Sequence, residues 1–221
     1  MNELVEVASL TKSYREAGRI VCVLKDISFS VMPNDYLAIV GPSGAGKSTL
    51  LHILGGLEHP TQGRVMFKKQ NIYKMKDKDV ALWRNKTIGF VFQFYHLIEE
   101  LNVLENVALA SFLKPRKSAL KNARILLKYL GIEERGNFFP SQLSGGEKQK
   151  VAIARALVND SEVILCDEPT GNLDKDSQVR VIELLEKLHR EKNKTIVLVT
   201  HNLQLARRAK RTLFLEAGEI K

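Results

Sequence analysis

The amino-acid sequence predicts an α/β fold: a core with a mainly parallel sheet, an N-terminal antiparallel β-subdomain and an inserted α-helical subdomain. Three observations support this. Strand patterns alternate with helical patterns, as in chains that build a parallel sheet covered on both faces. A glycine-rich loop follows the strand that ends at Val40 and leads directly into helical spacing. Between Gln93 and Leu143 the alternation gives way to helical periodicity, which indicates an insertion.

The strands are predicted from apolar residues near period two or from short apolar runs. They are expected at residues 4–10, 20–31, 35–40, 64–67, 88–92, 163–166 and 195–200. Helical spacing predicts helices at about 103–113, 120–130, 147–158 and 177–191. We expect one domain over residues 1–221, with a core at about 1–93 and 159–221 and a helical subdomain at about 94–158.

The charge balance leaves two classes of partner open. The net charge is +9 and the isoelectric point is near 9.5, which suits nucleic acid or an anionic membrane surface. The basic cluster at residues 207–211 is interpreted as a solvated helix face. No apolar run reaches the roughly 18 residues that a bilayer-spanning helix needs. Cys22 and Cys166 lie in apolar runs and are expected to be buried thiols.

A phosphate-binding loop is predicted over residues 41–48. Its sequence is Gly41-Pro42-Ser43-Gly44-Ala45-Gly46-Lys47-Ser48, and Thr49 follows. Glycines let successive backbone N–H groups face an anion, and the helix that begins near Lys47 adds its positive end. Lys47 is expected to reach the β- and γ-phosphates, and Ser48 to place its hydroxyl on Mg²⁺. The loop alone does not separate an ATPase from a GTPase or a kinase.

Two carboxylates follow the buried run that ends at Cys166. Asp167 lies at the carboxyl end of the predicted strand, where it suits a Mg²⁺ ligand that acts through water. Glu168, next to it, can orient or deprotonate an attacking water. With the loop, these acids favour hydrolysis of a nucleoside triphosphate.

Over its whole length the chain resembles the ATP-binding subunits of ABC transporters. The resemblance rests on the loop, on the segment Leu143-Ser144-Gly145-Gly146-Glu147, and on further motif residues in the family's order. It implies that Tyr14 stacks on adenine and that Gln93 contacts Mg²⁺ and the attacking water. It also implies that His201 contacts the γ-phosphate.

The segment Leu143–Glu147 also indicates a second anion site. Ser144 is a good N-cap, and Gly145 and Gly146 expose backbone N–H groups at a helix start. By the resemblance, this signature and Asp174 of one chain complete the ATP site of another chain. We therefore expect a head-to-tail homodimer that binds two ATP molecules, with Mg²⁺, at one interface.

The sequence segments around the motifs resemble those of the lipoprotein-releasing and macrolide-exporter branch of the family. They are Leu54-Gly55-Gly56-Leu57, Pro60-Thr61-Gln62-Gly63 and the segment from Asp167 to Asp174. Since no membrane domain is fused to it, we expect a LolD-type subunit that powers release of lipoproteins from the inner membrane. This implies two transmembrane permease partners, docked near residues 94–103, and a peripheral location on the cytoplasmic face of the inner membrane.

Other functions of the same fold are the alternatives. A cell-division subunit of the FtsE type, an efflux subunit of the MacB type and an ATP-dependent regulator of membrane proteins all fit the motifs. A nucleic-acid-associated ATPase is disfavoured, because such chains insert long coiled coils where this chain has only residues 94–142. No nucleic acid is therefore expected as a partner.

Overall fold

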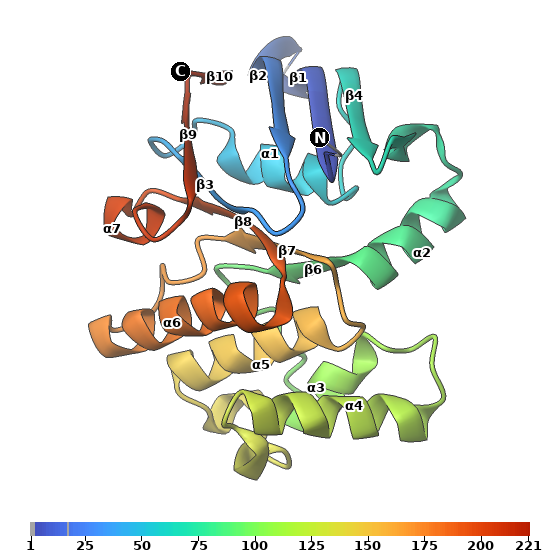
Figure 1. Cartoon of the computed structure of the whole chain (residues 1–221), viewed down its shortest axis with the longest axis vertical. Helices are drawn as coiled ribbons and strands as arrows, with labels where there is room; N and C mark the ends of the chain where they lie inside the picture. The colour runs from blue at the N-terminus through green and yellow to red at the C-terminus, as the bar shows by residue number, and fades with distance from the viewer. Residues whose placement is uncertain (1–2, 17) are drawn as a thin grey trace. The chain divides into compact units, whose positions relative to one another are not determined.

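The computed structural model describes residues 3–16 and 18–221, and the chain divides into two compact units (Figure 1). One unit comprises the chain up to Arg84 together with Thr195–Lys221, and the other comprises Asn85–Lys194. The first unit carries the phosphate-binding loop. The second carries the two carboxylates and the signature.

An antiparallel sheet forms the N-terminal part of the first unit. Its order is β2-β1-β4-β5, with β1 (Val5–Glu16), β2 (Arg19–Val31), β4 (Gln62–Phe67) and β5 (Gln70–Asn71). Val7 pairs with Phe29 on one side and with Val65 on the other. Strand β1 continues beyond the predicted end and so carries Tyr14 within the sheet.

A parallel group of strands holds the loop of the first unit. Strand β3 (Tyr36–Val40) runs parallel to β8 (Thr195–Thr200) and to β9 (Arg211–Glu216), and β10 (Glu219–Ile220) is antiparallel to β9. All residues of β3 and β8 are buried, as expected for central parallel strands. The helical elements here are α1 (Lys47–Leu54), η1 (Ile72–Lys74), α2 (Asp77–Thr87, which ends in the second unit) and α7 (Leu203–Ala206).

The second unit packs helices around a parallel pair, β6 (Ile88–Val91) and β7 (Val163–Asp167). Its helices are α3 (Val103–Leu109), α4 (Arg116–Tyr129), α5 (Gly145–Leu157) and α6 (Lys175–Lys192), with single turns η2 (Glu133–Arg135) and η3 (Pro140–Gln142). Helix α5 contacts α3, α4, α6 and β6 (Figure 1). A Cβ at Gly89 would lie 2.3 Å from the carbonyl oxygen of Ala156, so glycine is required where β6 meets α5.

The predicted fold class is confirmed, with the antiparallel sheet, the mainly parallel strands and the helical insertion all present. Helix α2 and strand β9 were not predicted. The subdivision at residues 94 and 158 stays a prediction. No helix in the described ranges is long and apolar enough to cross a membrane.

Two smaller predictions are wrong. The basic cluster 207–211 is not a helix face: Arg207 ends the four-residue helix α7, and Arg211 opens β9. The Arg211 guanidinium instead lies 2.6 Å from the Asp35 carboxylate. Cys22 is exposed, because it lies in the first part of β2, where successive residues are all exposed, whereas Cys166 is buried as predicted. Burial raises the pKa of the Cys166 thiol, which therefore stays protonated.

Candidate active site

The phosphate-binding loop joins β3 to α1 under close steric constraint. A Cβ at Gly41 would lie 1.9 Å from the Leu215 carbonyl oxygen, and one at Gly46 would lie 2.8 Å from Leu24. Gly46 also has φ +97° and is the N-cap of α1. No side chain caps α1, and its first turn holds no acidic residue. Its first N–H groups and its positive end therefore suit an anion.

Lys47 is folded back on this loop. Its Nζ donates to the carbonyl oxygens of Gly41 at 2.9 Å and Pro42 at 2.8 Å, and the residue is buried. The ammonium is thus held within the loop itself. A phosphate oxygen could replace these neutral acceptors with a charge-assisted bond, which is stronger.

Two further predicted residues lie at the same end of the first unit. Val40 of β3 pairs with Thr200 of β8, so the loop and His201 both leave the carboxyl ends of adjacent parallel strands. Ser48 lies in the first turn of α1 and is exposed. His201 is therefore near the beginning of the loop, and Ser48 is at the beginning of the helix that follows it, as the motifs require.

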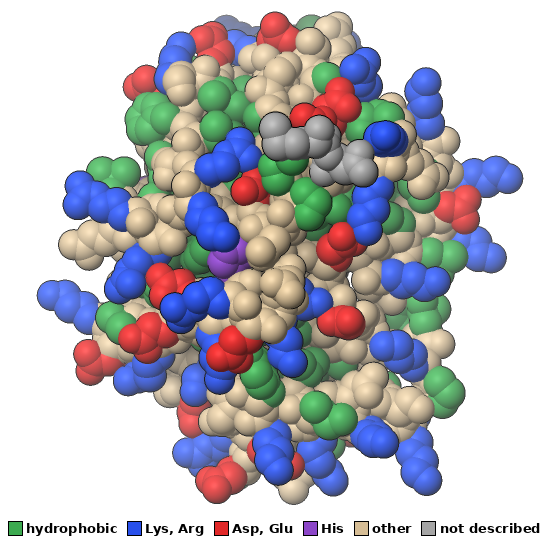
Figure 2. All heavy atoms as spheres, in the orientation of Figure 1, with side chains coloured by type: hydrophobic (Ala, Val, Ile, Leu, Met, Phe, Trp, Pro, Cys, Tyr) green, Lys and Arg blue, Asp and Glu red, His purple; other side chains and the backbone are tan. Residues whose placement is uncertain are grey.

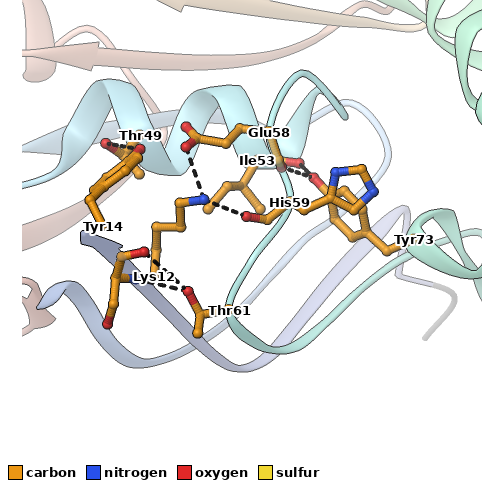
Figure 3. A network of polar contacts seen from close by, with 9 residues as sticks. Lys12, Tyr14, Thr49, Ile53, Glu58, His59, Thr61 and Tyr73 are labelled. Carbon is orange, nitrogen blue, oxygen red and sulfur yellow. Dashed lines mark hydrogen bonds and ion pairs between the residues drawn. The ribbon is translucent and has the colours of Figure 1, made fainter. Parts of the chain in front are cut away.

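Tyr14 lies on β1 beside the same helix (Figure 3). Its hydroxyl is 3.5 Å from the Thr49 hydroxyl, and the Lys12 ammonium lies 4.7 Å from the centre of its ring. The residue is 36% exposed, which leaves ring surface for a base to stack on. Burial, followed by the neighbouring Glu58, raises the pKa of the Tyr14 hydroxyl, so the ring stays neutral.

A polar network fixes Lys12 beneath this ring (Figure 3). Its Nζ lies 2.9 Å from the Glu58 carboxylate and donates to the His59 carbonyl oxygen at 2.8 Å. The Tyr73 hydroxyl contacts the Ile53 and Glu58 carbonyl oxygens, which ties this turn to the end of α1. Sequence reasoning missed Lys12 and Glu58. The signal for Lys12 was its position two residues before Tyr14, on the same face of a strand.

In the second unit, Gln93 and the two carboxylates follow paired strands. Val91 of β6 pairs with Cys166 of β7, so Asp167, the last residue of β7, and Gln93, two residues after β6, lie at the same edge. A Cβ at Gly171 would lie 3.0 Å from the Gln93 amide nitrogen, and Asn172 donates to the Gln93 carbonyl oxygen at 3.2 Å. The structure thus brings Gln93 against the loop that follows Glu168.

Glu168 has an unusual backbone. Its φ is +44°, a left-handed conformation that is rare for residues other than glycine. The Gly171 N–H donates to the Glu168 carbonyl oxygen at 3.0 Å and closes the turn. Such conformations cost of order 1–3 kcal/mol and are concentrated at functional sites. The turn fixes the direction in which the half-buried carboxylate leaves the strand.

The signature segment begins α5 with a capping box, as the N-cap prediction required. Ser144 Oγ accepts from the Glu147 N–H at 3.3 Å, and Glu147 accepts from the Ser144 N–H at 2.8 Å. Arg135 also bonds the Glu147 carboxylate, at 2.9 Å. The Ser144 N–H first and then Arg135 lower the pKa of Glu147. Arg135 thereby offsets the one acid in the first turn of the helix.

The two signature glycines permit close contacts as well as exposed N–H groups. A Cβ at Gly145 would lie 3.1 Å from the Tyr95 hydroxyl, and one at Gly146 would lie 2.8 Å from the Ser177 hydroxyl. Ser177 belongs to the first turn of α6, which Asp174 caps at 2.9 Å. Glycine at position 146 therefore lets the amino ends of α5 and α6 approach each other.

A hollow of 350 Å³ lies at these two helix ends. It is lined by Ser144, Gly146, Glu147, Lys150, Ser177, Arg180 and Val181. Arg180 donates to the Ser177 hydroxyl at 3.0 Å. Two cations and the amino end of a capped helix make this hollow suitable for an anion. Sequence reasoning missed Ser177 and Arg180; the only signal was their helical spacing from Asp174.

Arg155 links the signature helix to the segment after Gln93. Its guanidinium donates to the Tyr95 carbonyl oxygen at 2.7 Å and also to that of His96. His96 has φ +48°, so the chain turns sharply at this bond. These two hydrogen bonds therefore join α5 to the residues that follow Gln93.

The donor set expected for Mg²⁺ consists of the Ser48 hydroxyl, the Gln93 amide and the Asp167 carboxylate. Within the described ranges, no group of three or more His, Cys, Asp and Glu side chains could hold a metal ion. Mg²⁺ usually keeps several waters and takes one or two carboxylates plus phosphate oxygens. The oxygen atoms that Ser48, Gln93 and Asp167 carry are ligands of the type that Mg²⁺ takes.

Comparison with known proteins places the chain in a family. The family model described as ABC transporter matches residues 24–171. The lipoprotein-releasing system ATP-binding protein LolD of Idiomarina loihiensis is 45% identical over 97% of this chain and 95% of its own length. The LolD protein of Syntrophus aciditrophicus is 43% identical, over 98% of each chain.

A solved structure agrees with these relatives. The dimeric, post-hydrolysis structure of the ATP-binding cassette MJ0796, bound to ADP and Pi, superposes with a TM-score of 0.90 at 39% identity. The match covers 98% of this chain and 96% of that one. The chain therefore belongs to the ABC transporter family and is one of its ATP-hydrolysing cassettes.

Proposed function

We propose that this chain is the ATPase subunit of a lipoprotein-releasing transporter of the LolD type. The observation that carries this is the near full-length similarity to two LolD proteins from different organisms. This similarity agrees with the sequence segments around the motifs, which resemble those of the lipoprotein-releasing branch. ATP hydrolysis on this chain would then power the release of lipoproteins by its membrane partners.

The active form is proposed to be a homodimer with two ATP molecules at its interface. The loop of one copy and the hollow at the α5 and α6 ends of the other are both suited to phosphate. A related cassette is dimeric with hydrolysis products bound. The γ-phosphate would lie between the loop of one copy and Ser144, Gly145 and Gly146 of the other, with Asp174 also reaching across.

Within each site, the side chains have separate roles. Lys47 leaves its two carbonyl acceptors and binds the β- and γ-phosphates, Tyr14 holds the base, and His201 contacts the γ-phosphate. Glu168 accepts the proton of the attacking water, which Gln93 helps to position. Ser48, Asp167 and Gln93 would hold Mg²⁺, which neutralises charge on the β- and γ-phosphates when bound.

The second unit offers a surface for the membrane partners. Phe94, Ile98 and Phe112 are exposed although apolar, with 66%, 39% and 70% of their surfaces accessible. Exposed apolar side chains mark protein interfaces where they form one contiguous patch. We propose that cytoplasmic loops of two permease subunits dock near residues 94–103, which places the chain peripherally on the cytoplasmic face of the inner membrane.

The test is purification of the chain with its native membrane partners, followed by ATPase assays with an acylated lipoprotein. The partners are expected to carry a periplasmic lipoprotein-binding domain, and the acylated protein is expected to stimulate turnover. The same protein without its acyl chains is the control. Partners of the cell-division or efflux type, or equal stimulation by both forms, would contradict the lipoprotein assignment.

A further inference from the structure

Helix α4 carries a stripe of cations on its outer face. Lys117, Lys121, Arg124 and Lys128 are spaced four, three and four residues apart, so they share one side of the helix, and all are exposed. The opposite side, with Ala119, Ala123 and Leu127, is buried. We call these four residues the basic stripe.

The basic stripe forms part of the lining of a hollow of about 420 Å³. Its remaining lining consists of Leu104, Leu120, Ile125 and Glu133. Ile125, beside the stripe in the same lining, is 57% exposed. A hollow of this size is at the lower end of those that hold small organic ligands, about 300 to 1,000 Å³.

The charges of the stripe are not neutralised by neighbouring acids. Within the described ranges, no ion pair joins any of the four cations to a carboxylate, and Glu133 is the single acid in the lining. Figure 2 shows Lys and Arg side chains, with apolar and a few acidic ones among them, at the lower edge of the visible face, where Figure 1 draws α4. Four positive charges and an apolar floor are complementary to an amphiphile with an anionic head.

We propose that the basic stripe and its hollow bind anionic phospholipid at a membrane surface. Phosphate groups would lie against the four cations, while Ile125 and Leu120 contact the upper part of the acyl chains. Clusters of Lys and Arg beside a membrane are attracted to anionic lipid headgroups. The apolar floor disfavours nucleic acid, whose binding sites of this charge would place polar or aromatic groups there.

The inference rests on the proposed function in one respect, that the chain works beside a membrane.

Removal of two cations is expected to weaken partitioning to anionic vesicles by about 25-fold, since each Lys or Arg near such a surface contributes about fivefold. Removal of apolar surface at Ile125 is expected to weaken it by about fivefold.

The experiment compares the full chain with a Lys121→Gln, Arg124→Gln double variant in flotation with phosphatidylglycerol vesicles. The matched control is Lys74→Gln, Lys76→Gln, which removes the same charge from a hollow in the first unit that also contains Glu6 and Asp79. Wild-type chain and control are expected to bind anionic vesicles, not phosphatidylcholine vesicles, and the stripe variant is expected to lose binding. Equal loss in both double variants, or no binding by the wild type, would overturn the proposal.

Two further measurements test the role of the hollow and separate lipid binding from the proposed ATPase function. Ile125→Ser keeps every charge, and it is expected to lower binding to anionic vesicles with the salt dependence unchanged. An Ile125→Ser chain that binds like the wild type would overturn the role of the hollow. ATPase turnover without vesicles is expected to be unchanged in all variants, so loss of lipid binding and failure of the ATPase assignment are distinguishable.

Discussion

At the residue scale, a half-buried ion pair in the first unit holds the ring of Tyr14, the proposed base-binding residue, in place. Tyr14 is positioned by the Lys12 ammonium at 4.7 Å, and Lys12 is in turn fixed by Glu58. The Lys12 and Glu58 side chains are 13% and 26% exposed, so solvent screens this pair less than an ordinary surface pair. If Tyr14 stacks on the base as proposed, Lys12 is expected to act on ATP through Tyr14 rather than by contact.

Lys12→Met keeps most of the side-chain volume and removes the charge beneath the ring. The expected result is a rise in the KM for ATP of about two- to fivefold, the size of an exposed cation–π contact, with kcat unchanged. Steady-state ATPase kinetics measure it. The control is Lys25→Met, whose ion pair with Glu219 is long, at 4.0 Å, and half-exposed. A fall in kcat without a change in KM would contradict the positioning role.

Glu168→Gln tests the proposed base. The amide keeps the shape of the side chain but cannot accept the proton, so turnover is expected to fall by about 10²- to 10⁴-fold. ATP binding is expected to remain, and ATP should shift the variant to a dimer in gel filtration. Glu183→Gln, on the exposed side of α6, is the control. Turnover near the wild-type rate in the Glu168 variant would remove this residue from the role.

Motif residues could be predicted from the sequence because each motif is local. Gly41–Ser48 needs only a strand before it and a helix after it, and both are visible as periodicity. The partners of those residues could not be predicted. Lys12 meets Glu58 across 46 positions of the chain, and Arg180 reaches the signature hollow only because α5 and α6 pack together. Such contacts depend on tertiary structure, which periodicity does not contain.

At the element scale, the amino end of α5 depends on its capping box. Ser144 and Glu147 each accept an N–H of the other, and Arg135 bonds the same carboxylate. The signature can therefore present its N–H groups in a fixed direction. Prediction of the helix start succeeded because capping is a local pattern, whereas the end of α3 was predicted about four residues too late.

Glu147→Ala is expected to destabilise the chain by about 1 kcal/mol, as loss of a capping interaction does. Glu147→Gln should retain the hydrogen bond to Ser144. Because the native pKa of Glu147 is lowered, its charged form stabilises the fold above the unfolded-state pKa. That contribution is lost as the pH falls through the native pKa.

Thermal unfolding across the acidic pH range measures both the loss of stability in Glu147→Ala and the contribution of the Glu147 charge. The difference between wild type and Glu147→Gln should shrink as the pH falls through the native pKa. A difference that is constant with pH would show that the Glu147 charge contributes nothing.

Arg155 joins α5 to the segment after Gln93 through two hydrogen bonds. Arg155→Lys keeps the charge but cannot bond two carbonyl oxygens with one planar fork. Stimulation of ATPase activity by the membrane partners is expected to fall by about tenfold, the middle of the usual range for coupling residues. Basal turnover of the isolated chain should change little, and a parallel loss of both would indicate a merely structural role.

At the scale of the whole molecule, each unit carries part of the proposed catalytic machinery. The loop, Tyr14 and His201 belong to the first unit, and Gln93, Glu168 and the signature belong to the second. The similarity to a dimeric cassette and the anion-suited hollow at the signature support an active site shared between two copies. The central claim is therefore that the loop of one chain works with the signature of another.

Mixing two inactive variants tests that claim most directly. Lys47→Met disables the loop, and Ser144→Arg disables the signature, so each homodimer should hydrolyse no ATP. A mixed dimer contains one site with both defects and one site with neither. An equal mixture is expected to regain about a quarter of wild-type turnover, since about half of the dimers are mixed and each has one intact site. A mixture as inactive as the separate variants would contradict a shared site.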